Sequence, residues 1–447
     1  TATECLYYQP KFLRWAGKDP HFINILHGAL HSEPELPTDL FNDVDSSGKQ
    51  HMIIIETNST SAGLCQMPAV WSIDPMGIYK SVIESAFNDI LEKADPLLGG
   101  LAVVHYTNVM ESSGYAAALA EVAKEKVWLV TWKFDDPNPP LKWLHQILYI
   151  RDANGEWHSI RACFRMGMKT PWIVYPLITR TLVMNPVVTC LAGGRNKMMA
   201  SRAYELFNEE LSGSGLTVKY PKTLCNLKKA EIPTQIKQMG GHAVIKSPYS
   251  SVGSGVYTIT NSKELQNFLD EKHHYDNFLL QSLVGNISWY KTLQPEQYYI
   301  TGSNPGVFED NYLIDFRMVL SGCKKGFRPV CVYARRARTP LVEDYRDLSA
   351  LNSWDMLGIT LTVPDSTGKL IKEIDRLIPL DKKTFDQAKI DIDDLVDAYV
   401  QSFLATIAID KMSSRLIRDD KEFNYALFKE MNPDPMLLRE IDSSSKS

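Results

Sequence analysis

A chain of 447 residues with 44% hydrophobic residues, 23% charged residues and a formal net charge of −5 has the composition of an ordinary soluble globular protein. Its length suffices for two to four domains of about 150 residues each. No sustained basic run favours nucleic acid and no apolar run could span a bilayer, so neither partner is expected. The seven widely spaced cysteines lack a C-x-x-C pair, and the first residues do not resemble a signal peptide, which together predict reduced thiols and a cytoplasmic location.

The first third of the chain is predicted to form an α/β domain. A buried strand at 52–55 leads into a loop rich in hydroxyl groups, and helical periodicity follows at 78–94. Two apolar strands then flank an alanine-rich helix, which is the spacing of a βαβ unit with a parallel sheet. The strands of this unit are expected at 101–105 and 127–131, its helix at 114–126, and further strands at 143–150 and 158–164.

Strands and helices alternate in the rest of the chain. Helices are expected at 198–211, 227–239, 262–271 and 395–408, and the last of these is long and amphipathic. Strands are expected at 277–284, 312–320, 328–334 and 425–431. An Asn-Pro turn follows the last predicted strand.

A short apolar run that ends in a lysine, a loop of small residues and a second β-rich run lie between residues 243 and 259. This order can form a hairpin lid over a nucleotide triphosphate, because small residues let backbone N–H groups approach phosphate oxygens closely. The lysine precedes the glycines, so the segment is not a P-loop. A plain hairpin turn is the alternative interpretation. The residues proposed to contact phosphate are Lys246, Ser250, Ser251, Gly253, Ser254 and Gly255.

The order of these features resembles the ATP-grasp superfamily from residue 180 to residue 435. The resemblance is carried by Asn196-Lys197, Lys246 with its loop, the strand 278–284 before Gly285, Asp315-Phe-Arg317, Arg335-Arg336 and Glu430-Met-Asn432. It implies an α/β and α+β architecture, in which an N-terminal βαβ-type domain at 1–180 precedes a two-subdomain ATP-grasp fold. The small subdomain would span 181–285 and the C-terminal subdomain 286–440.

The resemblance also implies sites for ATP and Mg²⁺. Lys197 and Lys246 would neutralise phosphate charge, and adenine would bind at the end of the following strand. The adenine-binding residues would be Gln281, Ser282, Leu283 and Val284. Glu430 and Asn432 alternate on the predicted strand and so share a face that suits Mg²⁺, although an ordinary strand end with an Asn-Pro turn is the alternative. The third metal ligand would be Asp410, with Asp419 or Asp420 as alternatives.

Two further groups of polar residues are assigned to catalysis and to substrate binding. Asp315 and Arg317 share a strand face, and Arg317 would hold a phosphate or an acyl-phosphate oxyanion. Arg335 and Arg336 are adjacent and face opposite ways, so one of the two would assist. The loop after strand 52–55 and one strand arginine are predicted to bind substrate through Glu56, Asn58, Ser59, Ser61 and Arg165.

The function implied by the resemblance is ATP-dependent ligation. A small-molecule carboxylate would be activated as an acyl phosphate and attacked by an amine, with release of ADP and phosphate. The protein would position the reactants and would need no nucleophile of its own. A homodimer is compatible with this function, and the sequence does not specify the oligomeric state. Two alternatives stay open, a small-molecule phosphotransferase on the same fold and a non-catalytic nucleotide-binding regulatory protein.

Overall fold

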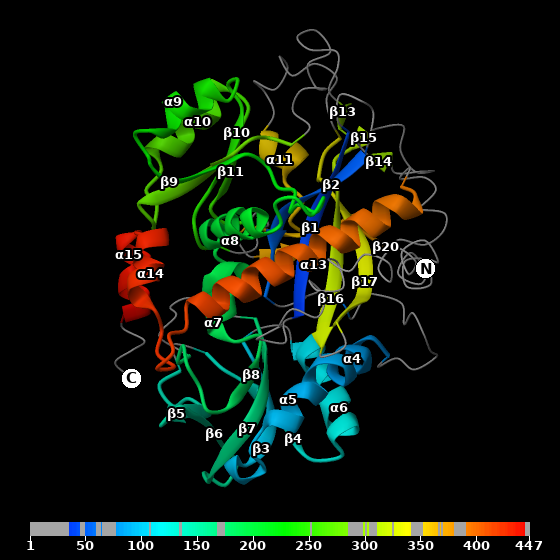
Figure 1. Cartoon of the computed structure of the whole chain (residues 1–447), viewed down its shortest axis with the longest axis vertical. Coiled ribbons are helices and arrows are strands. Elements are labelled where there is room, and N and C mark those ends of the chain that lie inside the picture. The colour runs from blue at the N-terminus through cyan, green and yellow to red at the C-terminus, as the bar shows by residue number, and fades with distance from the viewer. Residues whose placement is uncertain are drawn as a thin grey trace.

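The structure is a computed structural model that describes residues 35–44, 50–59, 64, 77–106, 109–133, 136–167, 175–250, 253–284, 298–299, 302–303, 311–323, 326–340, 352–364, 367, 370–379 and 390–442. Figure 1 shows a sheet with helices at the bottom, a small sheet with two helices at the upper left, and a tall central sheet. The long helix α13 (Ile392–Arg415) crosses the central sheet. The mixed α/β class predicted from the sequence is confirmed.

The lower sheet has the strand order β4-β3-β7-β6-β5, and β8 pairs with β7. The helix α6 (Val109–Ala123) connects β3 to β4, which run parallel, so the predicted βαβ unit is confirmed. The helix expected at 78–94 consists of α4 (Gly77–Val82), a π-helical turn (Ile83–Phe87) and α5 (Asn88–Lys93). The strands are β3 (Gly100–His105), β4 (Val127–Thr131), β5 (Leu141–Leu144), β6 (Ile147–Arg151), β7 (Trp157–Met166) and β8 (Leu182–Met184).

The small sheet is antiparallel and has the strand order β11-β10-β12-β9. Its strands are β9 (Thr223–Lys228), β10 (Ala243–Lys246), β11 (Val256–Ile259) and β12 (Asn277–Gln281), and its helices are α9 (Ile232–Gln238) and α10 (Ser262–Asp270). Ile245, Phe268 and Phe278 are buried between the sheet and these helices. This separate apolar core fixes the direction in which β10 ends, and therefore the position of Lys246.

The central sheet joins the N-terminal strands to strands from the last third of the chain. Its order is β13-β1-β16-β17-β20, with β2 paired to β1. The strands are β1 (Glu35–Val44), β2 (Gln50–Thr57), β13 (Tyr298–Tyr299), β16 (Ile314–Cys323), β17 (Gly326–Arg336) and β20 (Leu377–Pro379). The predicted N-terminal domain of residues 1–180 therefore needs correction, because β1 and β2 belong to the sheet of β16 and β17. Strand pairing between distant segments leaves no local mark in the sequence.

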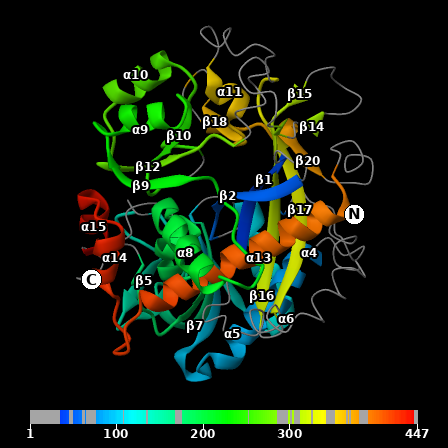
Figure 2. The same ribbon diagram turned by 45° about the horizontal axis from the view of Figure 1, so that its top comes forward.

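Short elements complete the upper part of the molecule, where Figure 2 shows α11 beside β18. They are β14 (Gly302–Ser303), β15 (Asn311–Tyr312), α11 (Ser353–Leu357), β18 (Thr362–Pro364) and β19 (Leu370–Lys372).

The helix α13 passes through the core of the molecule. The Asp391 side chain caps its first turn by accepting from the backbone nitrogens of Asp393 and Asp394, and the Asp394 carboxylate returns a bond to Asp391. Successive residues such as Phe403, Leu404 and Ala405 are all fully buried, so the helix is enclosed on every side. It packs against β2 and against α8 (Lys197–Glu210), which follows the short helix α7 (Val187–Thr189). The helices predicted at 198–211 and 395–408 are thus confirmed.

The segment predicted as the last strand is instead a helix, α14 (Tyr425–Met431), and α15 (Pro435–Asp442) follows it. The Asn424 side chain begins α14 by accepting from the backbone nitrogen of Leu427 at 3.2 Å. A short apolar run can form either a strand or a buried helical turn, and the capping residue decides in favour of the helix.

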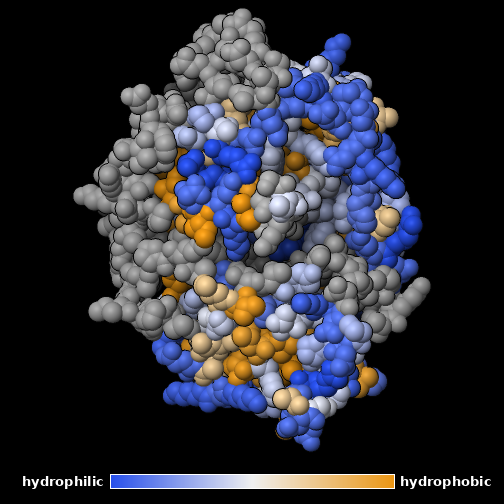
Figure 3. All heavy atoms as spheres, turned by 180° about the vertical axis from the view of Figure 1, so that it is seen from behind, coloured by the Kyte–Doolittle hydropathy of each residue, from blue (hydrophilic) through white to orange (hydrophobic). Residues whose placement is uncertain are grey.

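Within the described parts of the chain, every helix is too short or too polar to cross a bilayer. Figure 3 shows, from behind, that apolar side chains gather on the lower half of the molecule, which holds the parallel sheet and α4 to α6. Of the eight large hydrophobic side chains that are exposed among the described residues, five belong to this half, namely Leu97, Val109, Met110, Leu129 and Leu144. The lower sheet therefore presents the least polar of the described surfaces.

Candidate nucleotide and substrate site

Two lysines approach the end of β2 from different elements. Lys246 ends β10 and is 5% exposed, and its Nζ donates to the backbone oxygen of Ile55 at 3.3 Å. Lys197 is the first residue of α8, and its Nζ lies 3.8 Å from Oε2 of Glu56. Both ammonium groups therefore lie where the small sheet and α8 meet the central sheet.

Burial sets the electrostatics of both lysines. It lowers the pKa of Lys246 to about 8, with Glu56 opposing the shift and Lys197 reinforcing it. It also lowers the pKa of Lys197, again against the attraction of Glu56. In the described part of the chain no carboxylate oxygen lies within 4.0 Å of the Lys246 ammonium, so its dehydration is poorly compensated. An anion placed beside these groups would recover that cost.

The lid hairpin consists of β10, residues 247–255 and β11. The backbone nitrogen of Ser247 donates to the oxygen of Gly255 at 2.7 Å, which closes the base of its loop. Lys197 Nζ donates to the backbone oxygen of Ser250 at 3.0 Å and to its Oγ at 3.2 Å. The loop and the first residue of α8 are therefore in direct contact, as a shared phosphate site requires.

The glycines of the lid hairpin have backbone conformations that favour glycine. Gly253 has a φ of 76° and Gly255 a φ of 66°, in the left-handed region. Added Cβ atoms would also lie 2.8 Å from Thr360 and 2.7 Å from Ser247, respectively. Ser254 is exposed beside them, and Ser251 lies outside the described residues.

Asp39, Asp315, Arg317 and Arg335 form a buried aspartate–arginine cluster in the central sheet. Arg317 donates to Asp39 through Nε at 2.5 Å and Nη2 at 2.6 Å. Arg335 donates to Asp315 through the same two nitrogens, and its Nη2 also lies 2.8 Å from Oδ2 of Asp39. Asp39 faces Arg317 across β1 and β16, and Asp315 faces Arg335 across β16 and β17. The strand register therefore assembles the cluster.

The cluster holds its carboxylates and guanidinium groups charged. Burial alone would raise the pKa of Asp39, but Arg317 and Arg335 outweigh it and hold that pKa well below its ordinary value. Arg336 points elsewhere, because its guanidinium lies 4.7 Å from the ring centre of Tyr312 and Nη2 lies 3.6 Å from Asp375. The opposite orientation of Arg335 and Arg336 predicted from strand geometry is confirmed.

Asp39 is the residue of this cluster that the sequence analysis did not identify. It lies in a stretch without clear periodicity, 278 positions from its partner Arg317. The only sequence signal would have been the two arginines themselves, because buried guanidinium groups require acidic partners and Asp315 can serve only one fully.

A carboxylate and an amide lie together at the end of β2. Asn58 Nδ2 is 3.3 Å from Oε1 of Glu56, while Oε2 of Glu56 faces Lys197. The Glu56 side chain is 30% exposed, so the pair is partly open. Oxygen atoms of this type are the ligands that Mg²⁺ prefers. Glu56 and Asn58 thus lie beside the lysines, whereas Ser61 lies outside the described residues.

The predicted adenine-binding residues follow directly from β12. Gln281 donates through Nε2 to Oγ1 of Thr223 at 2.9 Å, and the backbone nitrogen of Ser282 donates to the oxygen of Lys222 at 2.9 Å. These bonds tie the end of β12 to β9. Leu283 and Val284 continue beyond the strand. β12 pairs directly with β10, so this end of the small sheet is connected to the lysine strand.

The predicted metal ligands are not brought together. Glu430 is exposed on α14, and Asn432 is buried at the end of that helix, so the shared strand face on which the pair was predicted does not exist. Asp410 is buried near the end of α13. Both ribbon views draw α14 at the edge of the molecule, apart from β16 and β17.

The alternative ligands are also accounted for. Asp420 forms an exposed ion pair with Arg418 at 2.8 Å, and its neighbour Asp419 is likewise exposed. Such exposed groups are typical of a solvated turn.

Arg165 and Ser59 meet through a buried cysteine. Arg165 is fully buried, and it donates to the backbone oxygens of Asn185 at 2.6 Å and Gly167 at 3.0 Å. Its Nη2 also lies 3.0 Å from Sγ of Cys190, which in turn lies 2.9 Å from Oγ of Ser59. Arg165 therefore fixes the end of β7 and the loop after β2 rather than opening onto solvent.

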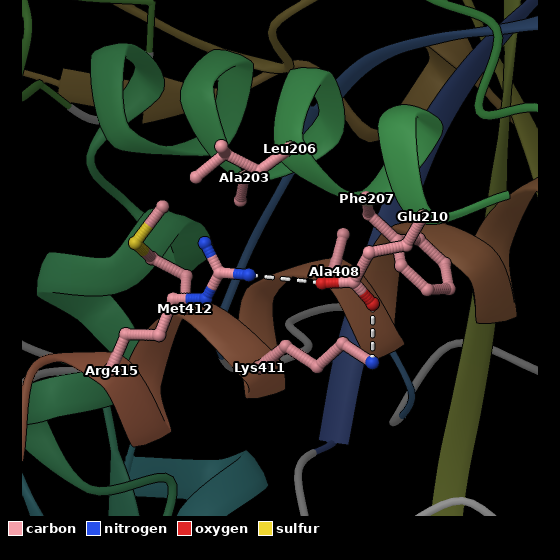
Figure 4. A pocket seen from close by; sticks show the side chains of 8 residues that line it. All are labelled: Ala203, Leu206, Phe207, Glu210, Ala408, Lys411, Met412 and Arg415. Atoms are coloured by element: carbon pink, nitrogen blue, oxygen red, sulfur yellow. Dashed lines mark hydrogen bonds and ion pairs between the residues drawn. The ribbon is translucent and has the colours of Figure 1, made fainter. Parts of the chain in front are cut away.

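A shallow pocket at the far end of α8 is separate from this site. Figure 4 shows that it lies between α8 and α13, where Glu210 forms ion pairs with Lys411 at 2.5 Å and Arg415 at 2.9 Å. Lys197 and Glu210 are the first and last residues of α8, which is 14 residues long. At about 1.5 Å per residue, the pocket is roughly 20 Å from Lys197.

Solved structures to which the chain is similar are ATP-grasp proteins. A glutathione synthetase-like effector from Globodera pallida is 12% identical, with a TM-score of 0.41, over 75% of this chain and 82% of its own. A RimK domain ATP-grasp protein from Sphaerobacter thermophilus is 13% identical, with a TM-score of 0.31, over 67% of this chain and 99% of its own. The macrocyclase MdnC from Microcystis aeruginosa, bound with its precursor peptide MdnA, is 10% identical, with a TM-score of 0.29, over 68% and 98%. No protein-family model and no curated protein matches the sequence.

Proposed function

We propose that the chain is an ATP-dependent ligase of the ATP-grasp type, which activates a substrate carboxylate as an acyl phosphate for attack by an amine. The observation that carries the proposal is the convergence of two buried lysines, Lys197 and Lys246, on the end of β2 beneath the lid hairpin. The two subdomains would be residues 181–285 and 286–440, with β1 and β2 completing the second. ATP would lie between them.

The lysines would bind the phosphate chain. Dehydrated ammonium groups with little local compensation are suited to a polyanion, and the backbone of the lid hairpin adds N–H donors. Gln281 and the residues after it would receive the adenine ring at the other end of the small sheet. This arrangement covers the inner phosphates and leaves the γ-phosphorus facing the central sheet, where the substrate carboxylate would approach.

Mg²⁺ would be held by Glu56 and Asn58 in place of the ligands predicted from the sequence. Their oxygens lie together, partly open and beside Lys197, whereas Glu430 lies on an outer helix. When bound, the ion would supply positive charge to the phosphate oxygens. Glu56 would then exchange its attraction to the two lysines for attraction to the ion. That exchange would leave the lysines free for phosphate.

The substrate would lie between the loop after β2 and the carboxyl ends of the parallel strands. Ligands of open α/β sheets bind outside this edge. Cys190 links Arg165, near the end of β7, with Ser59 of the loop, so the two structures adjoin. Arg317 and Arg335 would stabilise the oxyanion from the central sheet, because their positions are fixed by Asp39 and Asp315.

The test is an ATP turnover screen over small carboxylates and amines, with mass spectrometry of the products. We expect ADP and phosphate, and hydroxylamine in place of the amine should trap a hydroxamate. AMP as the sole nucleotide product would refute the proposal, and a phosphorylated product without condensation would indicate a phosphotransferase. The Lys246→Ala variant should bind ATP roughly tenfold to a hundredfold more weakly, the value of a charge-assisted contact. Exposed Lys237 of α9 provides the matched control, Lys237→Ala.

A further inference from the structure

The short helix α11 packs directly on the loop of the lid hairpin. A Cβ atom at Gly253 would lie 2.9 Å from Cζ2 of Trp354 and 2.8 Å from Cγ2 of Thr360. A Cβ atom at Gly358 would lie 2.7 Å from the same indole, at Cδ2 and Cε2. Glycines on both segments thus leave room for the indole, which rests against the backbone of the loop.

Hydrogen bonds tie the start of α11 to the same hairpin. Oγ of Ser353 lies 2.6 Å from Oγ1 of Thr258 in β11, and both residues are buried. The backbone nitrogen of Ser353 donates to Oε1 of Glu264 at 2.9 Å, and Oε2 of Glu264 accepts from the nitrogen of Thr260 at 2.8 Å. The contact therefore has a buried polar part as well as an apolar one.

The other side of α11 is anchored to the end of β17, the strand that carries Arg335. The backbone nitrogens of Arg338 and Thr339 both donate to the oxygen of Asp355 at 3.0 Å. Arg376 donates through Nη1 to the oxygen of Arg336 at 2.9 Å and through Nη2 to the oxygen of Thr360. α11 consequently connects the lid hairpin with the central sheet.

We propose that α11 is a latch for the lid hairpin, and that Trp354 is a positioning residue that holds the glycine loop in the conformation that receives phosphate. The proposal deepens the proposed function and rests on it for the identity of the anion. The indole touches no nucleotide in this role. It acts by keeping the loop at Gly253 and Gly255 pressed toward Lys197, and so raises the fraction of molecules that are ready to bind.

The first measurement involves no nucleotide. Amide hydrogen exchange of the free protein should become faster over residues 253–260 in Trp354→Ala, while the peptide that contains β12 stays unchanged. The matched control is Trp157→Ala, which removes a partly buried indole from β7 in the lower sheet. Unchanged exchange over 253–260 in Trp354→Ala would overturn the latch, whatever the protein binds.

The second measurement is the affinity for MgATP by calorimetry. If Trp354→Ala reduces the ready fraction to about one tenth, the apparent dissociation constant should rise about tenfold. Trp354→Phe should restore much of the affinity, because a smaller ring can still cover the loop. Gly253→Ala should weaken binding as well, whereas Gly240→Ala, which has a φ of 89° and open space around its Cβ, should not. An affinity for MgATP that is equal in wild type and Trp354→Ala would overturn the positioning role.

The polar part of the latch is tested by a double-mutant cycle. Thr258→Val leaves the buried Ser353 hydroxyl without its closest partner and should weaken MgATP binding, and Thr258→Val with Ser353→Ala should recover part of the loss. Strictly additive effects in the cycle would contradict the coupling. Failure of the wild-type protein to bind MgATP at all would refute the proposed function, and the exchange result would still decide the latch separately.

Discussion

Replacement of Lys246 by methionine should stabilise the protein and abolish its binding of nucleotide. Lys246 is 5% exposed, and its ammonium has one described hydrogen bond, to a backbone oxygen at 3.3 Å. A buried charge with so little compensation costs free energy in the absence of ligand. Methionine has nearly the same length and keeps the apolar contacts of the lysine stem. Functional sites often store this kind of cost.

The magnitude follows from the pKa of Lys246, which burial lowers from 10.5 to about 8. Between these two values the unfolded chain binds more protons than the folded chain, so this lysine makes the wild-type protein more stable as the pH rises. Integration of the difference gives a penalty of about 3 kcal/mol at pH 7 and about 1.4 kcal/mol at pH 9.5. The advantage of Lys246→Met over wild type should therefore shrink by about half between these pH values.

The assay is urea unfolding of both proteins at pH 7 and pH 9.5, followed by circular dichroism, together with calorimetric titration with MgATP. The exposed Lys237→Met serves as the control, and its free energy of unfolding should match that of wild type within about 0.5 kcal/mol. A Lys246→Met protein that is less stable than wild type at pH 7 would refute the electrostatic argument. Normal MgATP affinity in this variant would remove Lys246 from the nucleotide site.

Three further variants test the neighbouring groups. Asp39→Asn leaves two buried arginines with a single aspartate and should lower the free energy of unfolding by about 3–5 kcal/mol in urea titrations, where a loss below 1 kcal/mol would contradict the cluster. Glu56→Gln should raise the Mg²⁺ concentration needed for half-maximal turnover, because an amide is a poorer ligand than a carboxylate. Glu430→Gln should leave that concentration unchanged, and a rise there would return Glu430 to the metal site.

The sequence predicted the lysine side of the site because its signals are local. The apolar run before Lys246 and the glycines after it occur within 17 residues, and Asn196 marks the start of α8 immediately before Lys197. Hairpins and helix starts are encoded by neighbouring residues, so their ends can be located from the sequence. The central sheet could not be derived in this way. Its β1–β16 pairing joins segments that are nearly 280 positions apart, and nothing near Asp39 indicates its partner.

The error at residues 425–431 has a different cause. Tyr425-Ala-Leu-Phe428 is apolar enough for a strand, and the alternation of Glu430 and Asn432 then placed two oxygen ligands on one face. Asn424 is a capping residue in front of that run, and it starts a helix instead. On a helix the two side chains are separated by about 200° around the axis, so one is exposed and the other is buried. A single misread element thus displaced the whole predicted metal site.

The arginines and lysines of the site differ in how their charge is compensated, and this difference separates their roles. Arg317 and Arg335 each use the Nε and Nη2 edge of the guanidinium group to bind an aspartate, so their charge is balanced and their planes are fixed before any ligand binds. A guanidinium group has five N–H donors, and the Nη1 side of each one is not engaged by the cluster. Lys197 and Lys246 share only Glu56 nearby and carry the uncompensated charge. The lysines would therefore supply the affinity for the polyanion, whereas the arginines would supply oriented donors that need no rearrangement as charge develops on the substrate. Substitution of a lysine should consequently appear in the dissociation constant for MgATP, while substitution of Asp39 should appear in stability and in the rate of turnover.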